Sequence, residues 1–130
     1  MAFGSYKKGS RTENELVKLF LGEGFSVIRA AGSGGGTPCP DILAFKKTEQ
    51  LGFECKAVEK TCLQLRKEQV EQLKKWEDNT NITTYVAWRV KGKIWHFVRL
   101  DYLKENPKSY SITIENARKY GIGLEHLLKK

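Results

Sequence analysis

The chain has 130 residues, a length that suits one domain with a single packed core. Lysine and arginine number 23 against 15 aspartates and glutamates, so the formal net charge is +8 at pH 7; this favours a polyanion such as nucleic acid as partner, unless the surplus serves solubility alone. No apolar run has the length of a signal peptide or a membrane span, and the three cysteines include no Cys-x-x-Cys pair, so we expect a cytoplasmic protein with reduced thiols, no membrane contact and no zinc site.

The first thirty residues predict a flexible arm, a helix and a short strand. Residues 1–9 are interpreted as a flexible basic arm. The run SRTE at residues 10–13 fits a capping box, so a helix is expected to begin at Ser10 and to end near Gly22. Residues 25–29 predict a short strand, and the Gly- and Pro-rich run after it predicts a loop.

The middle of the chain predicts a sheet. Residues 41–45 and 51–58 are expected to form a hairpin, joined by a polar turn at residues 46–50. Residues 65–78 have the helical period, with Leu65, Gln69, Leu73 and Trp76 on one side.

Two further strands and a less regular tail complete the chain. Residues 82–90 and 93–100 predict strands joined through residues 91 and 92. Residues 101–130 are treated as a C-terminal extension without an assigned role; we expect in it a short helix ended near Pro107, an extended segment at residues 111–115 and a final helix at residues 124–129. The order of elements predicts one α/β domain, a mixed central β-sheet flanked by α-helices.

Charged residues inside the predicted hairpin are the first candidates for a site. Side chains alternate across a strand, so Glu54 and Lys56 share the face opposite Phe53. Asp41 begins the partner strand, and hairpin partners lie about 5 Å apart. Two carboxylates this close favour a divalent cation, Mg²⁺ or Mn²⁺, and a lysine beside them could serve its bound water. The alternative is a surface salt bridge of Glu54 with Lys56 or with Arg29.

A third carboxylate, Glu13, lies on the apolar stripe of the first predicted helix. It could join the metal cluster, or it could complete the capping box with Ser10 and point to solvent. In either role the N-terminus of a helix would favour its negative charge.

Three runs resemble one known family. The runs GSRTENELVKLF, GFSVIRAAGSGGGTPCPDILAF and LGFECKAV, within residues 9–58, are similar to the archaeal Holliday junction resolvases, the Hjc family of the PD-(D/E)xK nuclease superfamily, and RAAGS is the most specific part of the match. The resemblance implies a restriction-endonuclease-like core and a Mg²⁺-dependent endodeoxyribonuclease that resolves four-way DNA junctions. It also implies a homodimer, since paired cuts require two sites related by symmetry.

The same resemblance implies roles for particular residues. Glu13, Asp41 and Glu54 would hold Mg²⁺, Lys56 would serve the attacking water, and Arg29 and Ser33 would contact phosphate and support cleavage. Many relatives have arginine directly after the helical glutamate, where this chain has Asn14, and Arg11 is a possible substitute for that contact. Further candidates for phosphate contact are the basic side chains of the arm and of the predicted helix at residues 65–78: Lys7, Lys8, Arg66 and Lys67.

Other interpretations remain open. The glycine run in residues 32–36 lacks a following Gly-Lys-Ser/Thr, so no nucleotide cofactor is expected. The strand at residues 93–100 is apolar on both faces, which suggests burial under a partner subunit. The chain could also be another nuclease on the same core, acting on flaps, mismatches or restriction-like sites, or a DNA-binding scaffold without catalysis.

Overall fold

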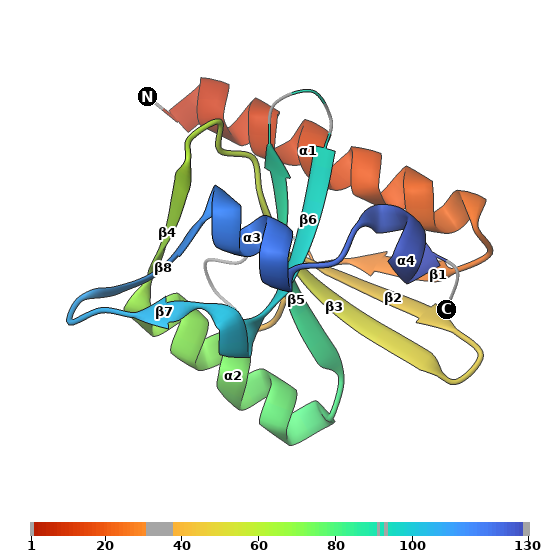
Figure 1. Cartoon of the computed structure of the whole chain (residues 1–130). Helices are drawn as coiled ribbons and strands as arrows, with labels where there is room; N and C mark the ends of the chain where they lie inside the picture. The colour runs from red at the N-terminus through yellow and green to blue at the C-terminus, as the bar shows by residue number, and fades with distance from the viewer. Residues whose placement is uncertain (1, 31–37, 91, 93, 129–130) are drawn as a thin grey trace.

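The structure, a computed structural model, describes residues 2–30, 38–90, 92 and 94–128, and of residues 2–10 only the backbone. At its centre is a five-stranded sheet in which β3 and β5 run parallel and all other neighbours antiparallel (Figure 1). In spatial order the strands are β1 (Ser26–Arg29), β2 (Ile42–Lys46), β3 (Glu49–Lys56), β5 (Thr83–Val90) and β6 (Ile94–Arg99). The predicted mixed sheet and hairpin are confirmed.

A smaller sheet and several helices flank the central sheet. The smaller sheet has the order β4 (Cys62–Arg66), β8 (Ser109–Thr113) and β7 (Lys104–Glu105). The helical segments are α1 (Ala2–Gly22), α2 (Lys67–Thr80), the 3₁₀ turn η2 (Leu100–Tyr102), α3 (Ile114–Tyr120) and α4 (Leu124–Leu128). None of the helices in the described part of the chain is both long and apolar enough to span a membrane.

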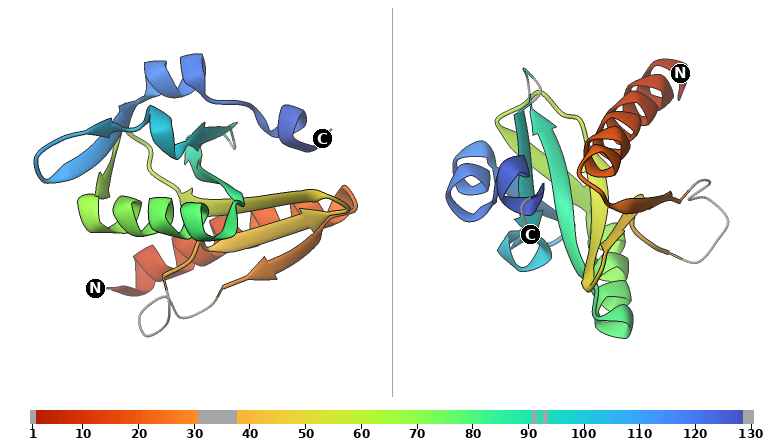
Figure 2. Two further views of the ribbon diagram at one scale, coloured as in Figure 1. Left: turned by 90° about the horizontal axis from the view of Figure 1, so that it is seen from below. Right: turned by 90° about the vertical axis from the view of Figure 1, so that its right-hand side faces the viewer.

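The central sheet has an apolar core on each face. Side chains alternate along β5, so Tyr85 packs with Phe20 of α1, whereas Val86 and Trp88 pack with Leu73 of α2 on the other side. The smaller sheet and α3 contribute to the second core, and Figure 2 shows α1 and α3 on opposite sides of the central sheet. Strand β3 therefore carries side chains into two different environments.

The C-terminal end of α1 forms where the glycines predict it. Gly24 has φ +88°, and its N–H donates to the carbonyl of Leu21, while the N–H of Phe25 donates to the carbonyl of Phe20. This is a Schellman motif, which satisfies the last carbonyls of the helix and requires a left-handed residue. It turns the chain directly into β1.

The N-terminal end of α1 differs from the prediction. The helix begins at Ala2, so residues 2–9 are helical and not a flexible arm, and Ser10 lies inside the helix. The capping-box pattern is a local signal that also fits a helix interior, and no proline in residues 2–9 stops the helix from extending. Glu13 is therefore not part of a helix cap.

Several elements differ from the prediction, and the strand β4 was missed because its pairing partner lies far along the chain. Leu65 belongs to strand β4, which pairs with Tyr110 and its neighbours in β8, so α2 begins two residues later than predicted. The short helix expected before Pro107 is wrong: η2 and β7 occupy this segment. The extended segment is confirmed for residues 111–113, which lie in β8, and the last helix is confirmed as α4. Residues 114 and 115 instead begin α3, which is capped by the Thr113 hydroxyl and was not predicted.

The apolar strand β6 is covered from within the chain. Trp95 and Phe97 are buried in the core beneath α1, and Val98 is buried in the core on the other face. The outer edge of β6 also exchanges two backbone hydrogen bonds between Phe97 and Ile122, each 2.9 Å long. The pattern that suggested a covering partner subunit is thus explained by the chain's own packing.

Candidate active site

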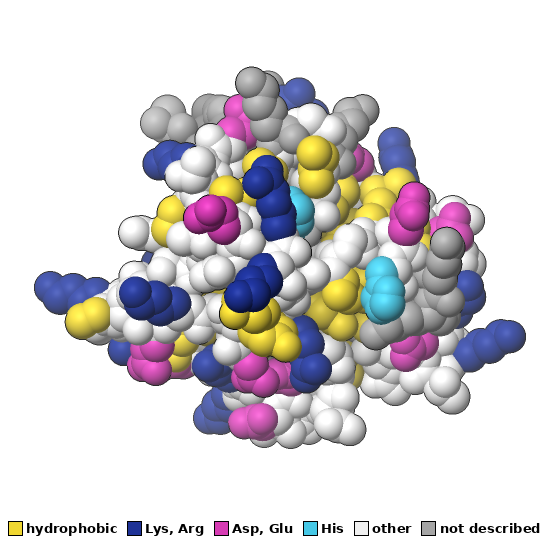
Figure 3. Space-filling model, viewed as in Figure 1, with side chains coloured by type: hydrophobic (Ala, Val, Ile, Leu, Met, Phe, Trp, Pro, Cys, Tyr) yellow, Lys and Arg dark blue, Asp and Glu magenta, His cyan; other side chains and the backbone are white. Residues whose placement is uncertain are grey.

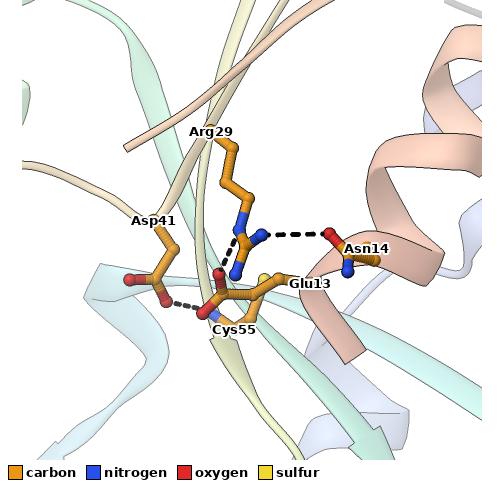
Figure 4. A network of polar contacts seen from close by, with 5 residues as sticks. All are labelled: Glu13, Asn14, Arg29, Asp41 and Cys55. Atoms are coloured by element: carbon orange, nitrogen blue, oxygen red, sulfur yellow. Dashed lines mark hydrogen bonds and ion pairs between the residues drawn. The ribbon is translucent and has the colours of Figure 1, made fainter. Parts of the chain in front are cut away.

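Asp41 lies at the point where the β2–β3 hairpin opens. Ile42 pairs with Phe53, so Asp41, the residue before β2, lies beside the next part of β3. Its Oδ2 accepts a hydrogen bond of 2.9 Å from the backbone N–H of Cys55 (Figure 4). This bond fixes the carboxylate against the strand that carries Glu54 and Lys56.

Glu54 and Lys56 project to the α2 side of β3, as strand alternation predicts. Glu54 is only 6% exposed, and the Nζ atom of Lys56 lies 3.8 Å from its Oε2. Gln69 of α2 contacts both groups: its Nε2 donates to Glu54 Oε2 at 2.5 Å, and its Oε1 accepts from Lys56 Nζ at 3.4 Å. The alternative of a surface salt bridge is therefore met only in part: Glu54 and Lys56 lie within ion-pair distance, but Glu54 is buried and Arg29 pairs with Glu13.

Glu13 reaches the site from α1. Its Oε1 accepts a hydrogen bond of 2.9 Å from Arg29 Nε of β1, and Arg29 Nη1 donates to Asn14 Oδ1 at 3.1 Å. Figure 4 shows these three side chains next to Asp41 and Cys55. Arg29 thus links the helix to the sheet edge where the acidic residues meet.

The electrostatics confirm that the carboxylates lie near one another. The pKa of Glu54 is raised to about 8, first by burial and then by the negative charges of Asp41 and Glu13, while Lys56 opposes the rise. Burial also raises the pKa of Asp41; the hydrogen bond from Cys55 lowers it, and the charge of Glu13 raises it. The buried Glu54 and the half-buried Asp41 therefore resist ionisation, and a cation beside them would stabilise their charged forms.

The described residues do not form a ready-made metal site. No three His, Cys, Asp or Glu side chains among them lie in an arrangement that would hold an ion. The reason is visible in the contacts: Glu13 turns to Arg29, and Asp41 to the Cys55 amide. The three predicted carboxylates are brought to one region, each with a partner from the protein.

The other predicted site residues are spread more widely. Arg11 and Arg66 are exposed, and Lys67 pairs with Glu105 at 2.9 Å. Ser33 and the side chains of Lys7 and Lys8 lie outside the described residues. On the face in Figure 3, Lys and Arg side chains are interspersed with Asp and Glu, so this face has no uniform basic patch.

Two residues of the site were not predicted as site residues. The sequence placed Gln69 on the packed side of its helix. An amide among apolar neighbours there could have indicated that it contacts other polar groups. Asn14 was noted as a departure from the family pattern, but its contact with Arg29 was not foreseen. All three cysteines are free, as expected, and it is the backbone of Cys55 rather than its thiol that contacts Asp41.

The fold and the site together define a class of protein. A mixed sheet that gathers acidic side chains from a helix and two neighbouring strands, with a lysine two residues after the last acid, is the arrangement of the PD-(D/E)xK nucleases. Within that class, the model of the family described as archaeal Holliday junction resolvase (Hjc) matches residues 4–130. The chain belongs to this family.

Individual relatives agree with this assignment. The crossover junction endodeoxyribonuclease Hjc of Methanocaldococcus jannaschii is 39% identical over 107 residues, 82% of this chain and 77% of the relative. The protein of the same name from Archaeoglobus fulgidus is 34% identical over 119 residues, 91% of this chain and 85% of the relative. The crystal structure of Archaeoglobus fulgidus Hjc, a Holliday junction resolvase, superimposes with a TM-score of 0.83 at 29% identity, covering 95% of this chain and 97% of that one.

Proposed function

We propose that this chain is a structure-selective endonuclease that resolves four-way DNA junctions by metal-dependent hydrolysis of phosphodiester bonds. Relatives that match most of the chain carry the name crossover junction endodeoxyribonuclease. The observation that carries the proposal is the proximity of Glu54, which is buried, and Asp41, which is half-buried; both carboxyls have a raised pKa, and Lys56 lies beside them. Such a cluster costs folding free energy and is typical of a functional site.

The donor set fits a hard divalent cation. Asp41 and Glu54 offer carboxylate oxygens, which Mg²⁺ and Mn²⁺ prefer as ligands. Both carboxyls have a raised pKa, so a bound cation would favour their charged forms. Glu54 Oε1 accepts no hydrogen bond within the described part of the chain and is available as a ligand. Asp41 and Glu54 would hold the ion, joined by Glu13 once it leaves Arg29. Bound there, the ion would stabilise the charge that develops on the phosphate during hydrolysis.

The protein's own groups have separate tasks. The ammonium of Lys56, which lies 3.8 Å from Glu54 Oε2, would attract a phosphate oxygen and orient the attacking water. Arg29, whose side chain is 36% exposed, would exchange part of its contact with Glu13 for a phosphate. Affinity from such contacts falls steeply with salt, and selectivity for a junction would come from the shape of the DNA.

A homodimer is part of the proposal. Resolution requires matched cuts in two strands, which two sites related by a two-fold axis would make. One chain supplies one such site, built from α1, β1, β2, β3 and α2. Analytical ultracentrifugation of the free protein and of its junction complex tests this part.

A cleavage assay tests the whole proposal. A four-way junction, a flap and plain duplex are each incubated with the protein in Mg²⁺ and in EDTA. We expect paired nicks in the junction alone, and only with Mg²⁺. Equal cutting of duplex would indicate a different nuclease on the same core, and junction binding without cutting of any substrate would indicate a scaffold.

A further inference from the structure

Gln69 makes a contact that the acidic site itself does not explain. It lies in the first turn of α2, and its side chain reaches Glu54 near the end of β3. Val70 and Leu73 bury this side of the helix in the second core, so α2 cannot rotate freely and the direction of Gln69 is fixed. The side chain therefore meets Glu54 and Lys56 from a rigid element.

The amide suits a carboxylate and an ammonium at the same time. Its nitrogen donates to Glu54 Oε2, and its oxygen accepts from Lys56 Nζ. A glutamate at this position could not donate to Glu54 when ionised, and a lysine could not accept from Lys56. Glutamine is the residue of this length that can bind both partners without adding charge.

We propose that Gln69 is a positioning residue that keeps Glu54 and Lys56 apart and holds each in its working orientation; this inference rests on the function proposed above. Lys56 Nζ lies 3.8 Å from Glu54 Oε2, farther than a direct charge-assisted hydrogen bond of about 2.8 Å. The amide nitrogen of Gln69 donates to Glu54 Oε2, and its oxygen accepts from the Lys56 ammonium. Glu54 Oε1 would thereby remain available to bind a cation.

The consequence of losing the amide follows from the charges. The terminal torsion of a glutamate is soft, so Glu54 would turn, and Lys56 would move from 3.8 Å to direct hydrogen-bonding distance of its carboxylate. Lys56 would then compete with a divalent cation for the carboxylate and would be withdrawn from the phosphate. Both metal binding and catalysis would weaken, whereas the DNA-binding surface would be unchanged.

The test compares Gln69→Met with Gln72→Met. Methionine matches glutamine in length and removes both hydrogen bonds. Gln72 is an exposed glutamine of the same helix, and its Nε2 donates to Glu68 Oε1 at 3.4 Å, away from the site. Three quantities are measured: the affinity of the DNA-free protein for Mn²⁺, by calorimetry; the rate of single-turnover cleavage at saturating junction; and the affinity for the junction in EDTA. For Gln69→Met we expect Mn²⁺ affinity and the cleavage rate to fall about 10–100-fold, with junction affinity within about twofold of wild type.

The controls separate this inference from the proposed function. Gln72→Met is expected to match wild type in all three measurements. If wild type binds Mn²⁺ and cleaves while Gln69→Met does both equally well, the positioning role is overturned and the proposed function stands. If wild type neither binds Mn²⁺ nor cleaves, the proposed function itself fails. If Gln69→Met melts at a markedly lower temperature, Gln69→Asn, which keeps the amide but is too short to reach both partners, must show the same losses.

Discussion

The acidic residues of the site differ in the exposed fraction of their side chains and in the residues that they contact. On the α2 side, Glu54 is 6% exposed and is held by Gln69 and Lys56. On the α1 side, the side chain of Glu13 is 20% exposed and pairs with an arginine that is itself 36% exposed. Exposed pairs contribute about 0–1 kcal/mol and exchange partners readily, whereas buried charges are costly and fixed. The α2 half is thus the rigid part of the site, and the α1 half is the part that can exchange its contacts.

The largest expected effect comes from breaking the rigid half at Glu54. Glu54→Gln keeps the shape of the side chain but removes the charge of a proposed metal ligand, so single-turnover cleavage is expected to fall by about 10³–10⁴. Junction binding, measured in EDTA, should survive or tighten because a negative charge is lost beside the phosphates. Glu13→Gln, in the adaptable half, should lose less. A Glu54→Gln protein that cleaves at nearly the wild-type rate would contradict the assignment of the site.

The buried half should also show in the pH dependence of stability. Glu54 has a pKa of about 8 in the folded chain, against 4.5 for an ordinary glutamate. Between these values the folded chain holds a proton that the unfolded chain has released, so the free energy of unfolding falls as the pH rises. Glu54→Gln cannot titrate and should be more stable than wild type at pH 9, by about 1–3 kcal/mol.

Urea denaturation at pH 5, 7 and 9, without divalent cations, measures this difference. At pH 5 the two proteins should be nearly equal, because Glu54 is then protonated in the folded chain. Glu68→Gln, an exposed glutamate of α2, provides the control and should follow wild type at every pH. Parallel pH curves for wild type and Glu54→Gln would show that Glu54 ionises normally.

The adaptable half should affect binding more than chemistry. Arg29→Met would remove the phosphate contact proposed for this side chain, so the dissociation constant of the junction should rise about 3–10-fold and the salt slope should fall by about one per chain. Lys67→Met should change affinity less than about twofold, because Glu105 and the carbonyl of Asn106 already hold that ammonium. Filter binding at several salt concentrations measures the junction affinity of both variants. Equal losses of affinity would show that Arg29 contributes no more to binding than Lys67.

The sequence predicted the parts of this site that depend on neighbours along the chain. The β2–β3 hairpin is local, so strand alternation was enough to bring Asp41 beside Glu54 and to separate Lys56 from Phe53. The contacts of Gln69 with Glu54 and of Arg29 with Asn14 were not predicted, since each joins residues fifteen positions apart in separate elements. Their geometry depends on how a helix packs on the sheet, and no local pattern encodes that packing.

The same reason explains the errors in the fold. Strand β4 gains its hydrogen bonds from β8, more than forty residues later, and without that partner its apolar residues resemble the start of α2. The stop of α1 was predicted because the Gly24 turn is a local requirement of the backbone. Its start was not, because a capping-box pattern does not exclude a helix that continues past it.

The smallest expected effect is at Asn14, where the family resemblance leads one to expect arginine. Asn14→Arg replaces an acceptor of Arg29 by a second exposed cation beside Glu13. Arg29 would lose that hydrogen bond and keep Glu13, while the new guanidinium could reach phosphate, so junction affinity at low salt should rise about twofold to fivefold. Because the gain is electrostatic, it should vanish at high salt, and the free energy of unfolding should change by less than about 0.5 kcal/mol. An increase that persists at high salt would mean that position 14 reads the shape of the junction and is not merely a counter-charge.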